Sequence, residues 1–296
     1  MPKAQANGIE IEYETFGDRS GRPLLLIMGL GSQLTGWSEE VLQQLADEGH
    51  RVIIFDNRDT GLSSKMEEAG APDISGVLKA LSRGEEIDVP YTFQDMGQDA
   101  LGLLDFLGIK KVHICGHSMG GAIAQTIAIS RPERLWSLIL ISAPTYNPGL
   151  PQPKPEITNL MRAATGADRT AYVEKAVEMA RAIAGSGFSL DEEWVRQISV
   201  RAYDRCYYPE GNGRHLLARL ANRNRRPAFQ SITAPTLVIH GDEDPLLPVE
   251  NALDAAATIP GAELMIIKGM GHYPPHRGPW PQIVKAISAH TKKAWG

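Results

Sequence analysis

Short apolar runs rich in β-branched residues alternate with stretches of helical periodicity through the first half of the chain. The runs predict strands at residues 9–16, 23–28, 51–56, 111–116 and 136–142. Three of these runs contain LLLIM, VIIF and LILI, nearly continuous apolar sequences that are typical of strands covered on both faces. The alternation of strands with helices predicts an α/β fold with a mostly parallel, doubly wound sheet.

Helical patterns occupy intervals between these strands, near residues 37–48, 92–107 and 118–130. In the second segment the apolar residues stand at positions 96, 100, 103, 104 and 107, which is the spacing of one buried stripe on a helix. The stripe indicates that this helix packs one of its sides against apolar neighbours and leaves the other polar.

The strand pattern breaks after Ser142. The sequence APTYNPGLPQPKPE that follows contains too many prolines for a helix or a central strand, and a polar, helical stretch then continues to Phe229. Strand patterns return at residues 235–241 and 262–268, each followed by a helical run. The sheet is thus expected to be interrupted by a helical segment and then completed.

This interruption predicts two structural parts. Residues 1–146 and 231–296 are expected to form the core domain, and residues 147–230 an inserted helical cap over the ends of the strands. A smaller insert at residues 65–89, rich in glycine, proline and charge, is expected over the same face.

Composition and charge exclude several classes of function. The formal net charge of −5 disfavours nucleic acid as a partner, because a phosphate-binding surface usually needs an excess of basic residues. The two cysteines, Cys115 and Cys206, are too few for a disulfide framework. The N-terminus has no apolar signal core, and no apolar stretch approaches the ~20 residues of a membrane span. We therefore expect a cytoplasmic protein without a membrane partner.

The strongest chemical signal is the sequence Gly116-His117-Ser118-Met119-Gly120-Gly121 between a predicted strand and a predicted helix. It matches the G-x-S-x-G nucleophile elbow in the strand–turn–helix context that this motif requires. A serine on so sharp a turn has a strained backbone and tolerates only small neighbours two residues away. Ser118 is therefore the candidate nucleophile.

A serine hydroxyl needs a base that a carboxylate orients. His272 follows two glycines after the last predicted strand, where a loop histidine has the freedom to reach Ser118. Three neighbouring acids, Asp242, Glu243 and Asp244, follow the preceding strand and are candidates for the orienting carboxylate.

The remaining histidines offer weaker candidates. His240 ends an apolar strand and is expected to be a satisfied core or edge residue, and the ring of His117 is expected to turn away from Ser118. The spacing of His272 and His276 resembles a helical metal pair, but the prolines between them forbid that helix. We expect neither a metal site nor a cofactor.

Five motifs together resemble the α/β-hydrolase superfamily. They are IMGLGS (27–32), FDNRDTGLS (55–63), GHSMGG (116–121), PTLVIHGDEDPLLP (235–248) and GMGH (269–272). The DNRDTGLS form and the GMGH ending are most similar to the carboxylesterase branch that includes aclacinomycin methylesterase. The resemblance implies an α/β-hydrolase fold from near Ile9 to the C-terminus.

The resemblance also assigns roles. It implies that Asp244, at the acid position of the family motif G-x-x-D, orients His272, and that the backbone amides of Leu30 and Met119 form the oxyanion hole. The chain departs from the family where Met28 replaces the histidine that usually opens the oxyanion loop. The amides do not depend on that side chain.

These assignments predict a serine carboxylesterase that hydrolyses small to medium esters through an acyl-enzyme. Met28, Gly29, Leu30, Trp37 and Met119 are expected to line an apolar substrate pocket. C–C bond hydrolysis and perhydrolysis by the same triad remain alternatives, as does a receptor that binds a small ligand with little turnover. The sequence leaves a homodimer open.

Two charged motifs are expected to have structural roles only. Asp56, Arg58 and Gly61 in DNRDTGLS are expected to fix a turn beneath the site. The basic sequence RLANRNRR at residues 219–226 is expected to be a solvated face of the cap.

Overall fold

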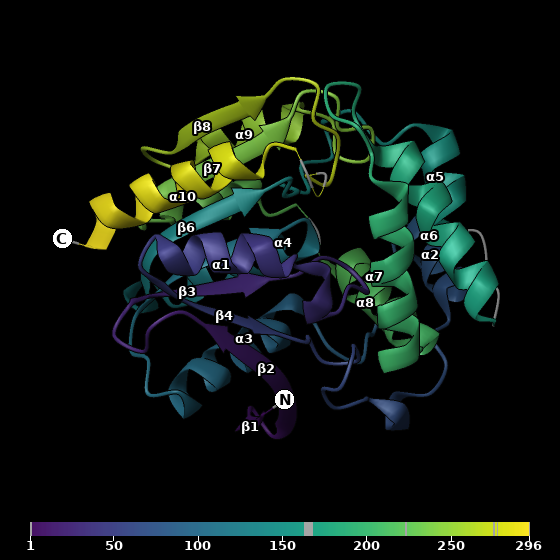
Figure 1. Cartoon of the computed structure of the whole chain (residues 1–296). Coiled ribbons are helices and arrows are strands. Elements are labelled where there is room, and N and C mark those ends of the chain that lie inside the picture. Colours follow the sequence, from purple (N-terminus) through teal and green to yellow (C-terminus); the bar gives the residue numbers. More distant parts are fainter. Residues whose placement is uncertain (1, 163–167, 223, 275, 277, 296) are drawn as a thin grey trace.

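The computed structural model describes residues 2–162, 168–222, 224–274, 276 and 278–295 (Figure 1). An eight-stranded sheet with the order β1-β2-β4-β3-β5-β6-β7-β8 forms its centre. Strands β3 to β8 run parallel, whereas β1 and β2 pair antiparallel with each other and β2 pairs antiparallel with β4. The strands are β1 (Lys3–Ala6), β2 (Ile9–Phe16), β3 (Arg22–Ile27), β4 (His50–Phe55), β5 (Val112–His117), β6 (Leu135–Ile141), β7 (Thr236–Gly241) and β8 (Glu263–Ile267).

The predicted α/β fold with a mostly parallel sheet is therefore confirmed. Each predicted strand begins and ends within one residue of its counterpart in the structure. Strand β1 was not predicted, because its sequence KAQA has no β-branched residue and only two small apolar side chains facing inward.

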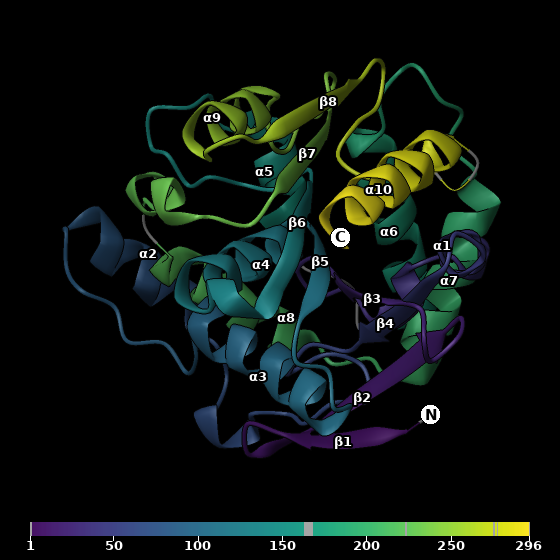
Figure 2. The ribbon, with the colours of Figure 1, turned by 90° about the vertical axis from the view of Figure 1, so that its left-hand side faces the viewer.

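Helices cover both faces of the sheet, which is why its strands are apolar on both sides (Figure 2). One face carries α1 (Glu39–Asp47) and α10 (Trp280–Trp295); the other carries α3 (Phe93–Phe106), α4 (Met119–Ser130) and α9 (Glu250–Thr258). Ser38 caps α1, and Thr92 with Asp95 forms a capping box at the start of α3. At both helix starts, a side-chain oxygen thus accepts a backbone N–H that has no partner within the helix.

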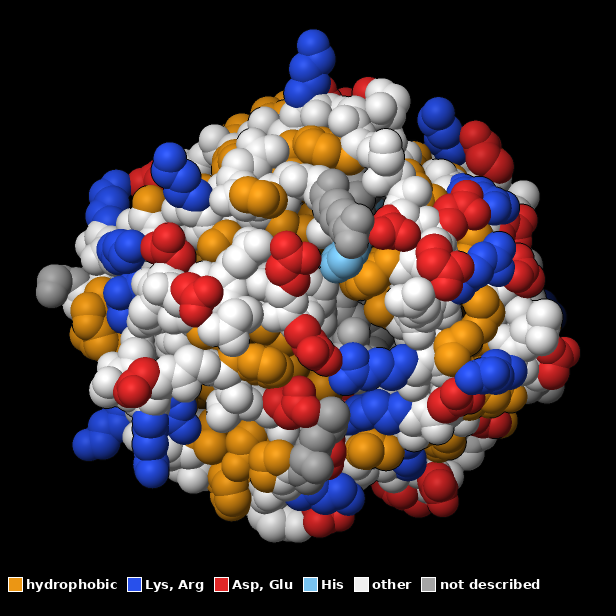
Figure 3. Space-filling view, in the orientation of Figure 1, with side chains coloured by type: hydrophobic (Ala, Val, Ile, Leu, Met, Phe, Trp, Pro, Cys, Tyr) orange, Lys and Arg blue, Asp and Glu red, His pale blue; other side chains and the backbone are white. Residues whose placement is uncertain are grey.

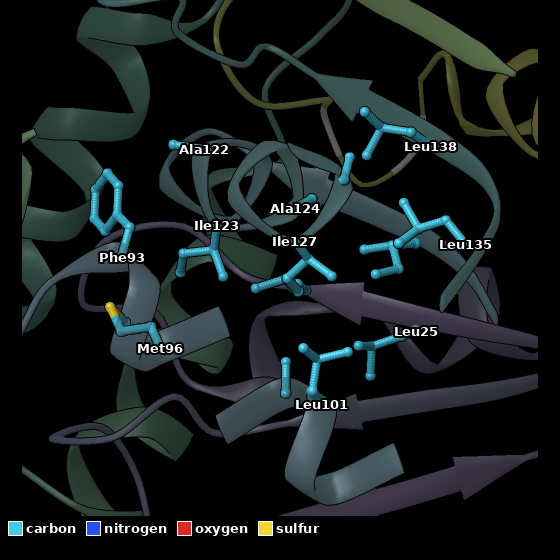
Figure 4. Packing of buried hydrophobic residues seen from close by; sticks show 14 of the residues in the cluster. Leu25, Phe93, Met96, Leu101, Ala122, Ile123, Ala124, Ile127, Leu135 and Leu138 are labelled. Atoms are coloured by element: carbon cyan, nitrogen blue, oxygen red, sulfur yellow. The ribbon is translucent and has the colours of Figure 1, made fainter. Parts of the chain in front are cut away.

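The packing beneath α4 fixes the start of this helix in place. Ile123 and Ile127 on α4 and Leu25 on β3 are fully or almost fully buried in one apolar cluster (Figure 4). Met96 of α3, which belongs to the predicted stripe, and Leu101, which does not, complete the layer. Truncating any of the larger side chains to alanine removes about 2–5 kcal/mol of stability.

Among the described residues between β6 and β7, four α-helices stand together at the end of the sheet (Figure 1). They are α5 (Pro155–Arg162), α6 (Arg169–Ile183), α7 (Glu192–Arg205) and α8 (Pro209–Ala221), and we call them the helical insert. Helix α6 packs against α7, and the short helix α2 (Ile74–Ser82), from the smaller insert, packs against α8. None of the described helices is long and apolar enough to cross a membrane.

The basic sequence at residues 219–226 is only in part the solvated face that we expected: Arg226 is exposed, Arg219 and Arg225 are partly buried, and Arg223 lies outside the described residues. The Arg225 guanidinium donates to the backbone oxygen of Ala122 at 2.8 Å, and burial lowers its pKa to about 10. Arg226 pairs with Asp254 at 2.6 Å, and Arg219 faces the central cavity described below. Charge counting could not reveal this, because the partners lie on distant core helices and loops.

Candidate active site

Ser118 stands on the tight turn between β5 and α4, with φ = 53° and ψ = −120°. Such positive φ is strained for a residue with a side chain. Its neighbours must be glycines: a Cβ on Gly116 would lie 2.3 Å from the Gly120 oxygen, and one on Gly120 would lie 2.1 Å from the Ile27 oxygen. The structure therefore has the predicted elbow, and the sheet and α4 together impose its geometry.

The structure brings Ser118, His272 and Asp244 into one hydrogen-bonded chain. The Ser118 hydroxyl lies 3.0 Å from His272 Nε2, and His272 Nδ1 lies 2.8 Å from Asp244 Oδ2. Because a carboxylate only accepts, Nδ1 carries the proton and Nε2 is left to accept from the serine. This is the tautomer that a general base needs.

Asp244 is held rigidly at the end of β7. Its Oδ1 accepts the backbone N–H groups of Leu246 and Leu247 at 2.9 and 2.8 Å, and its Oδ2 faces both His272 and His240. Burial alone would raise the pKa of Asp244, but the two histidines outweigh it and hold that pKa well below its ordinary value. The carboxylate is thus charged wherever the histidine works.

The other two acids of this loop point elsewhere. Asp242 accepts the backbone N–H of Gly269 at 2.6 Å, and Glu243 accepts the backbone N–H and hydroxyl of Ser186 at 2.6 and 2.8 Å. Of the three neighbouring carboxylates, Asp244 is therefore the one in contact with His272.

His117 and Tyr273 pack next to His272 and hold its backbone in position. His117 Nε2 donates to the His272 backbone oxygen at 3.1 Å, and its ring lies edge-on to Tyr273 at 5.0 Å between centroids. Burial lowers the pKa of His117 to about 3, so this ring stays neutral. The His272 backbone N–H in turn donates to the Ile183 oxygen at the end of α6, a tie to the helical insert.

Two backbone N–H groups close to Ser118 have no hydrogen-bond partner among the described residues. Gly29 lies so close that a Cβ there would be 3.3 Å from the Ser118 Cβ, which places the following residue, Leu30, near Ser118. Within the described part of the chain, the N–H groups of Leu30 and Met119 donate no hydrogen bond, and both residues line the cavity. Such amides are free to bind a negative oxygen.

A cavity of about 500 Å³ lies above Ser118, between the core and the helical insert. Figure 3 shows a hollow in this face, with hydrophobic, acidic and basic side chains around it. The core contributes Met28, Gly29, Leu30, Ser118, Met119 and His272; the insert contributes Tyr172, Met179, Ile183, Trp194, Val195 and Ile198, among others. A pocket of this size and apolar character suits a drug-sized organic molecule.

Trp37 does not line this cavity, contrary to our expectation. Its ring packs edge-on against Trp280 at 6.2 Å and is buried in the cluster beneath α1 and α10. Thr35 and Gly36 of the preceding 3-10 turn η1 (Leu34–Gly36) do line the cavity, so the lining ends just before this residue. The tryptophan at the cavity is instead Trp194, stacked on His276 at 4.6 Å between ring centroids.

No sequence motif indicates which residues of the insert line the cavity. Tyr172, Met179 and Trp194 belong to no motif, and helical periodicity shows only that α6 and α7 each bury one side. Asp56 and Arg58 do hold the turn beneath the site as predicted: Asp56 accepts the Leu34 N–H at 2.8 Å, and Arg58 pairs with Asp99 at 2.6 Å.

Residues 22–279 match the model of the alpha/beta hydrolase fold family, so the chain belongs to that family. The sequence is 30% identical to the rhodomycin D methylesterase DnrP of Streptomyces peucetius, over 99% of both chains. It is also 30% identical to the methylesterase DauP of Streptomyces sp. (strain C5), over 95% of this chain and 94% of the relative. The resemblance inferred from the five motifs is confirmed.

Solved structures show the same fold. A thermophilic esterase from Thermogutta terrifontis superposes with a TM-score of 0.73 at 27% identity, covering 99% of this chain and 98% of that one.

A 2-hydroxy-6-oxononadienedioate/2-hydroxy-6-oxononatrienedioate hydrolase of Cupriavidus pinatubonensis is 29% identical in sequence over 84% of this chain and 80% of its own. The family therefore identifies a hydrolase with relatives among methylesterases and other hydrolases.

Proposed function

We propose that this protein is a serine carboxylesterase that hydrolyses methyl or other small-alkyl esters of apolar acids. The observation that carries the proposal is the chain Ser118–His272–Asp244, with distances of 3.0 and 2.8 Å, at the floor of a 500 Å³ apolar cavity. The two methylesterase relatives support the ester class.

The geometry supports the following mechanism. His272 Nε2 takes the proton as Ser118 Oγ attacks the ester carbonyl, and Asp244 stabilises the imidazolium. The amides of Leu30 and Met119 bind the developing oxyanion, a contribution of about 2.7–4 kcal/mol for each donor. The alcohol leaves with the proton from His272, and water then releases the acid from the acyl-enzyme. The helical insert acts as a cap that excludes water and contacts the acyl group.

A fluorophosphonate probe tests the nucleophile. We expect one covalent adduct on Ser118 and complete loss of ester hydrolysis, because a chain with Ser118, His272 and Asp244 in contact activates only that hydroxyl. Ser118→Ala is the control and should neither react nor turn over. An adduct on another serine in active protein would contradict the assignment.

A substrate panel tests the reaction class. Nitrophenyl esters of increasing chain length, methyl esters of aromatic acids and a vinylogous diketone should be compared under one condition. The Cupriavidus relative makes C–C bond hydrolysis the second candidate. Faster cleavage of the diketone than of every ester would favour it, and ligand binding without turnover would favour a receptor.

A further inference from the structure

The segment at residues 28–34, which we call the oxyanion loop, has few hydrogen bonds of its own. Within it, the N–H of Ser32 donates to Gly29 at 3.2 Å. Leu34 is tied to Asp56 and Gly31 to His215, while the Gln33 side chain donates to the backbone oxygens of Ala202 and Cys206 at 2.7 and 2.9 Å. Three of these acceptors lie in or next to α7 and α8, which stand beside the end of β3 (Figure 1). The helical insert therefore holds much of this loop.

His215 is the residue in direct contact with the backbone next to Leu30. It is fully buried on α8, its Nδ1 lies 3.3 Å from the Gly31 nitrogen, and its Nε2 lies 2.8 Å from the Arg58 backbone oxygen. An amide only donates and a carbonyl only accepts, so Nε2 carries the proton and Nδ1 accepts from Gly31. One tautomer satisfies both bonds.

The surroundings keep the ring in this state. Burial lowers the pKa of His215 to about 4, so it is neutral at ordinary working pH. The ring of Tyr91 lies edge-on to it at 6.2 Å, and Arg58, whose oxygen it binds, is itself paired with buried Asp99. Gly31 has φ = 68°, and a Cβ there would lie 2.5 Å from Asn212 of the same helix, so α8 presses directly on this turn.

We infer that His215 is a positioning residue for the oxyanion hole. It fixes the peptide plane between Leu30 and Gly31 and so restrains the backbone torsions at Leu30. These torsions set the orientation of the adjoining Gly29–Leu30 peptide, whose N–H is the Leu30 amide that binds the reacting oxygen. The inference rests on the proposed function, because it concerns the donor that the ester mechanism uses. Through this bond the helical insert controls the rate of the chemical step as well as the fit of the substrate.

Two substitutions of His215 each remove one of its two hydrogen bonds, to Gly31 or to Arg58, and keep the other. The amide oxygen of asparagine lies near the position of Nδ1, whereas the amide nitrogen of glutamine lies near that of Nε2. His215→Asn should therefore keep the acceptor for Gly31 and lose the bond to Arg58, and His215→Gln should do the reverse. The inference requires the glutamine variant to be the slower enzyme.

The expected result is a split between kcat and KM. Complete loss of one oxyanion donor costs about 10²–10³ in kcat. A misaimed donor should cost about 10- to 100-fold in His215→Gln with KM changed less than about threefold, because the interaction is made only in the transition state. His215→Asn should stay within about fivefold of the native kcat.

His50→Gln is the matched control. His50 is fully buried, makes two ring hydrogen bonds (to Leu45 and Thr291) and has its pKa lowered to about 4, but lies at the start of β4, away from the site. We expect a comparable loss of thermal stability with native kcat. An equal fall of kcat in this control, or native kcat in His215→Gln, would overturn the inference.

Hydrogen exchange keeps the test independent of the substrate. The peptide that contains residues 28–34 should exchange faster in His215→Gln than in His215→Asn, and equal exchange in both would contradict the tie to Gly31. Absence of ester turnover in the native enzyme would refute the proposed function without affecting this measurement. If His215→Gln does not fold, His215→Leu replaces it, because leucine also removes the acceptor for Gly31: kcat should fall with KM little changed, and native kcat there overturns the inference.

Discussion

The core and the helical insert form opposite walls of one cavity. The core contributes residues that follow the ends of strands, and the insert contributes side chains on helices. In the core, Ser118, Asp244 and His272 follow the carboxyl ends of parallel strands; Asp244 and His272 are buried, and Ser118 is partly exposed and lines the cavity. In the insert, the cavity wall consists of single side chains on α6 and α7, such as Met179 and Trp194, whose outer faces carry exposed ion pairs. The core holds the reactive groups, and the insert supplies the contact area.

The difference teaches where each property of the enzyme is encoded. Reactive geometry depends on strand register and tight turns, which tolerate few changes, whereas the fit of the substrate depends on side chains that a helix can exchange freely. We therefore expect substitutions in the core to lower kcat and those in the insert to raise KM. The ties of the insert to the oxyanion loop and to His272 are the exceptions.

The largest expected effect lies in the core, at Asp244. Asp244→Asn removes the charge that stabilises the imidazolium and disturbs the tautomer of His272, and loss of this partner costs roughly 10⁴-fold in kcat in a serine protease. We expect a loss of several orders of magnitude with the fold intact, measured as kcat on one ester with circular dichroism as the check on folding.

The neighbouring acids are matched controls for this substitution. Asp242→Asn and Glu243→Gln should each stay within about tenfold of native kcat, or ~1.4 kcal/mol of barrier. Their carboxylates bind Gly269 and Ser186 rather than His272. A crippled Asp242→Asn beside an active Asp244→Asn would show that the acid is misplaced.

The sequence predicts the core part of the site better than the contacts between the core and the insert. The elbow at Ser118 was predictable because the steric need for Gly116 and Gly120 is local and leaves a short motif. The prediction for Trp37 was wrong because its ring packs against Trp280, a contact between distant parts of the chain that no local pattern reveals. The contact of His215 with Gly31 joins residues 184 positions apart, and nothing in either local sequence indicates it.

The second prediction concerns the attachment of the insert to the core. Arg214 on α8 pairs with Asp59 of the core at 2.8 Å, and both side chains are almost completely buried. Asp59→Asn leaves the buried guanidinium without its counter-charge, which typically costs about 3–5 kcal/mol. We expect a loss of this size in the free energy of unfolding, measured in urea. A loss below about 1 kcal/mol would mean that water reaches this pair.

The third prediction assigns acid sensitivity mainly to the core. Burial lowers the pKa of His50 to about 4 and those of His113 and His117 to about 3, whereas a histidine in the unfolded chain titrates near 6.5. Below pH ~6.5 these histidines are therefore protonated in the unfolded state but remain neutral in the folded state. The free energy of unfolding thus falls as pH drops toward 4. The depressed pKa of Asp244 matters only below pH ~4.

Unfolding in urea at pH 7 and at pH 5 measures this effect. Each histidine contributes up to about 1.4 kcal/mol per pH unit, so His50→Gln should flatten the dependence by about that amount near pH 5. A slope unchanged by this substitution would show that His50 is protonated in the folded protein.

The fourth prediction tests the contribution of the insert to binding. Trp194→Ala removes an aromatic wall of the cavity and its stack on His276, and should raise KM about tenfold with kcat within about threefold, as for uniform binding. Trp295→Ala, an aromatic residue outside the cavity, should leave both constants unchanged. A fall in kcat alone for Trp194→Ala would mean that the insert acts on the transition state here as well.

The smallest expected effect comes from a second ion pair between the same two regions. Arg201 on α7 and Glu39 on α1 are 3.0 Å apart, with side chains 52% and 71% exposed. Water and salt screen such a pair, and holding two long side chains in one geometry costs entropy that offsets the attraction. Glu39→Gln should therefore change Tm by less than about 2 °C, with the difference vanishing at about 1 M salt. Because Asp59→Asn breaks a pair that joins the same insert to the same core, burial is the main variable between the two. Equal shifts in Tm for the two variants would show that the insert is attached by charge alone, and that desolvation around Arg214 contributes nothing.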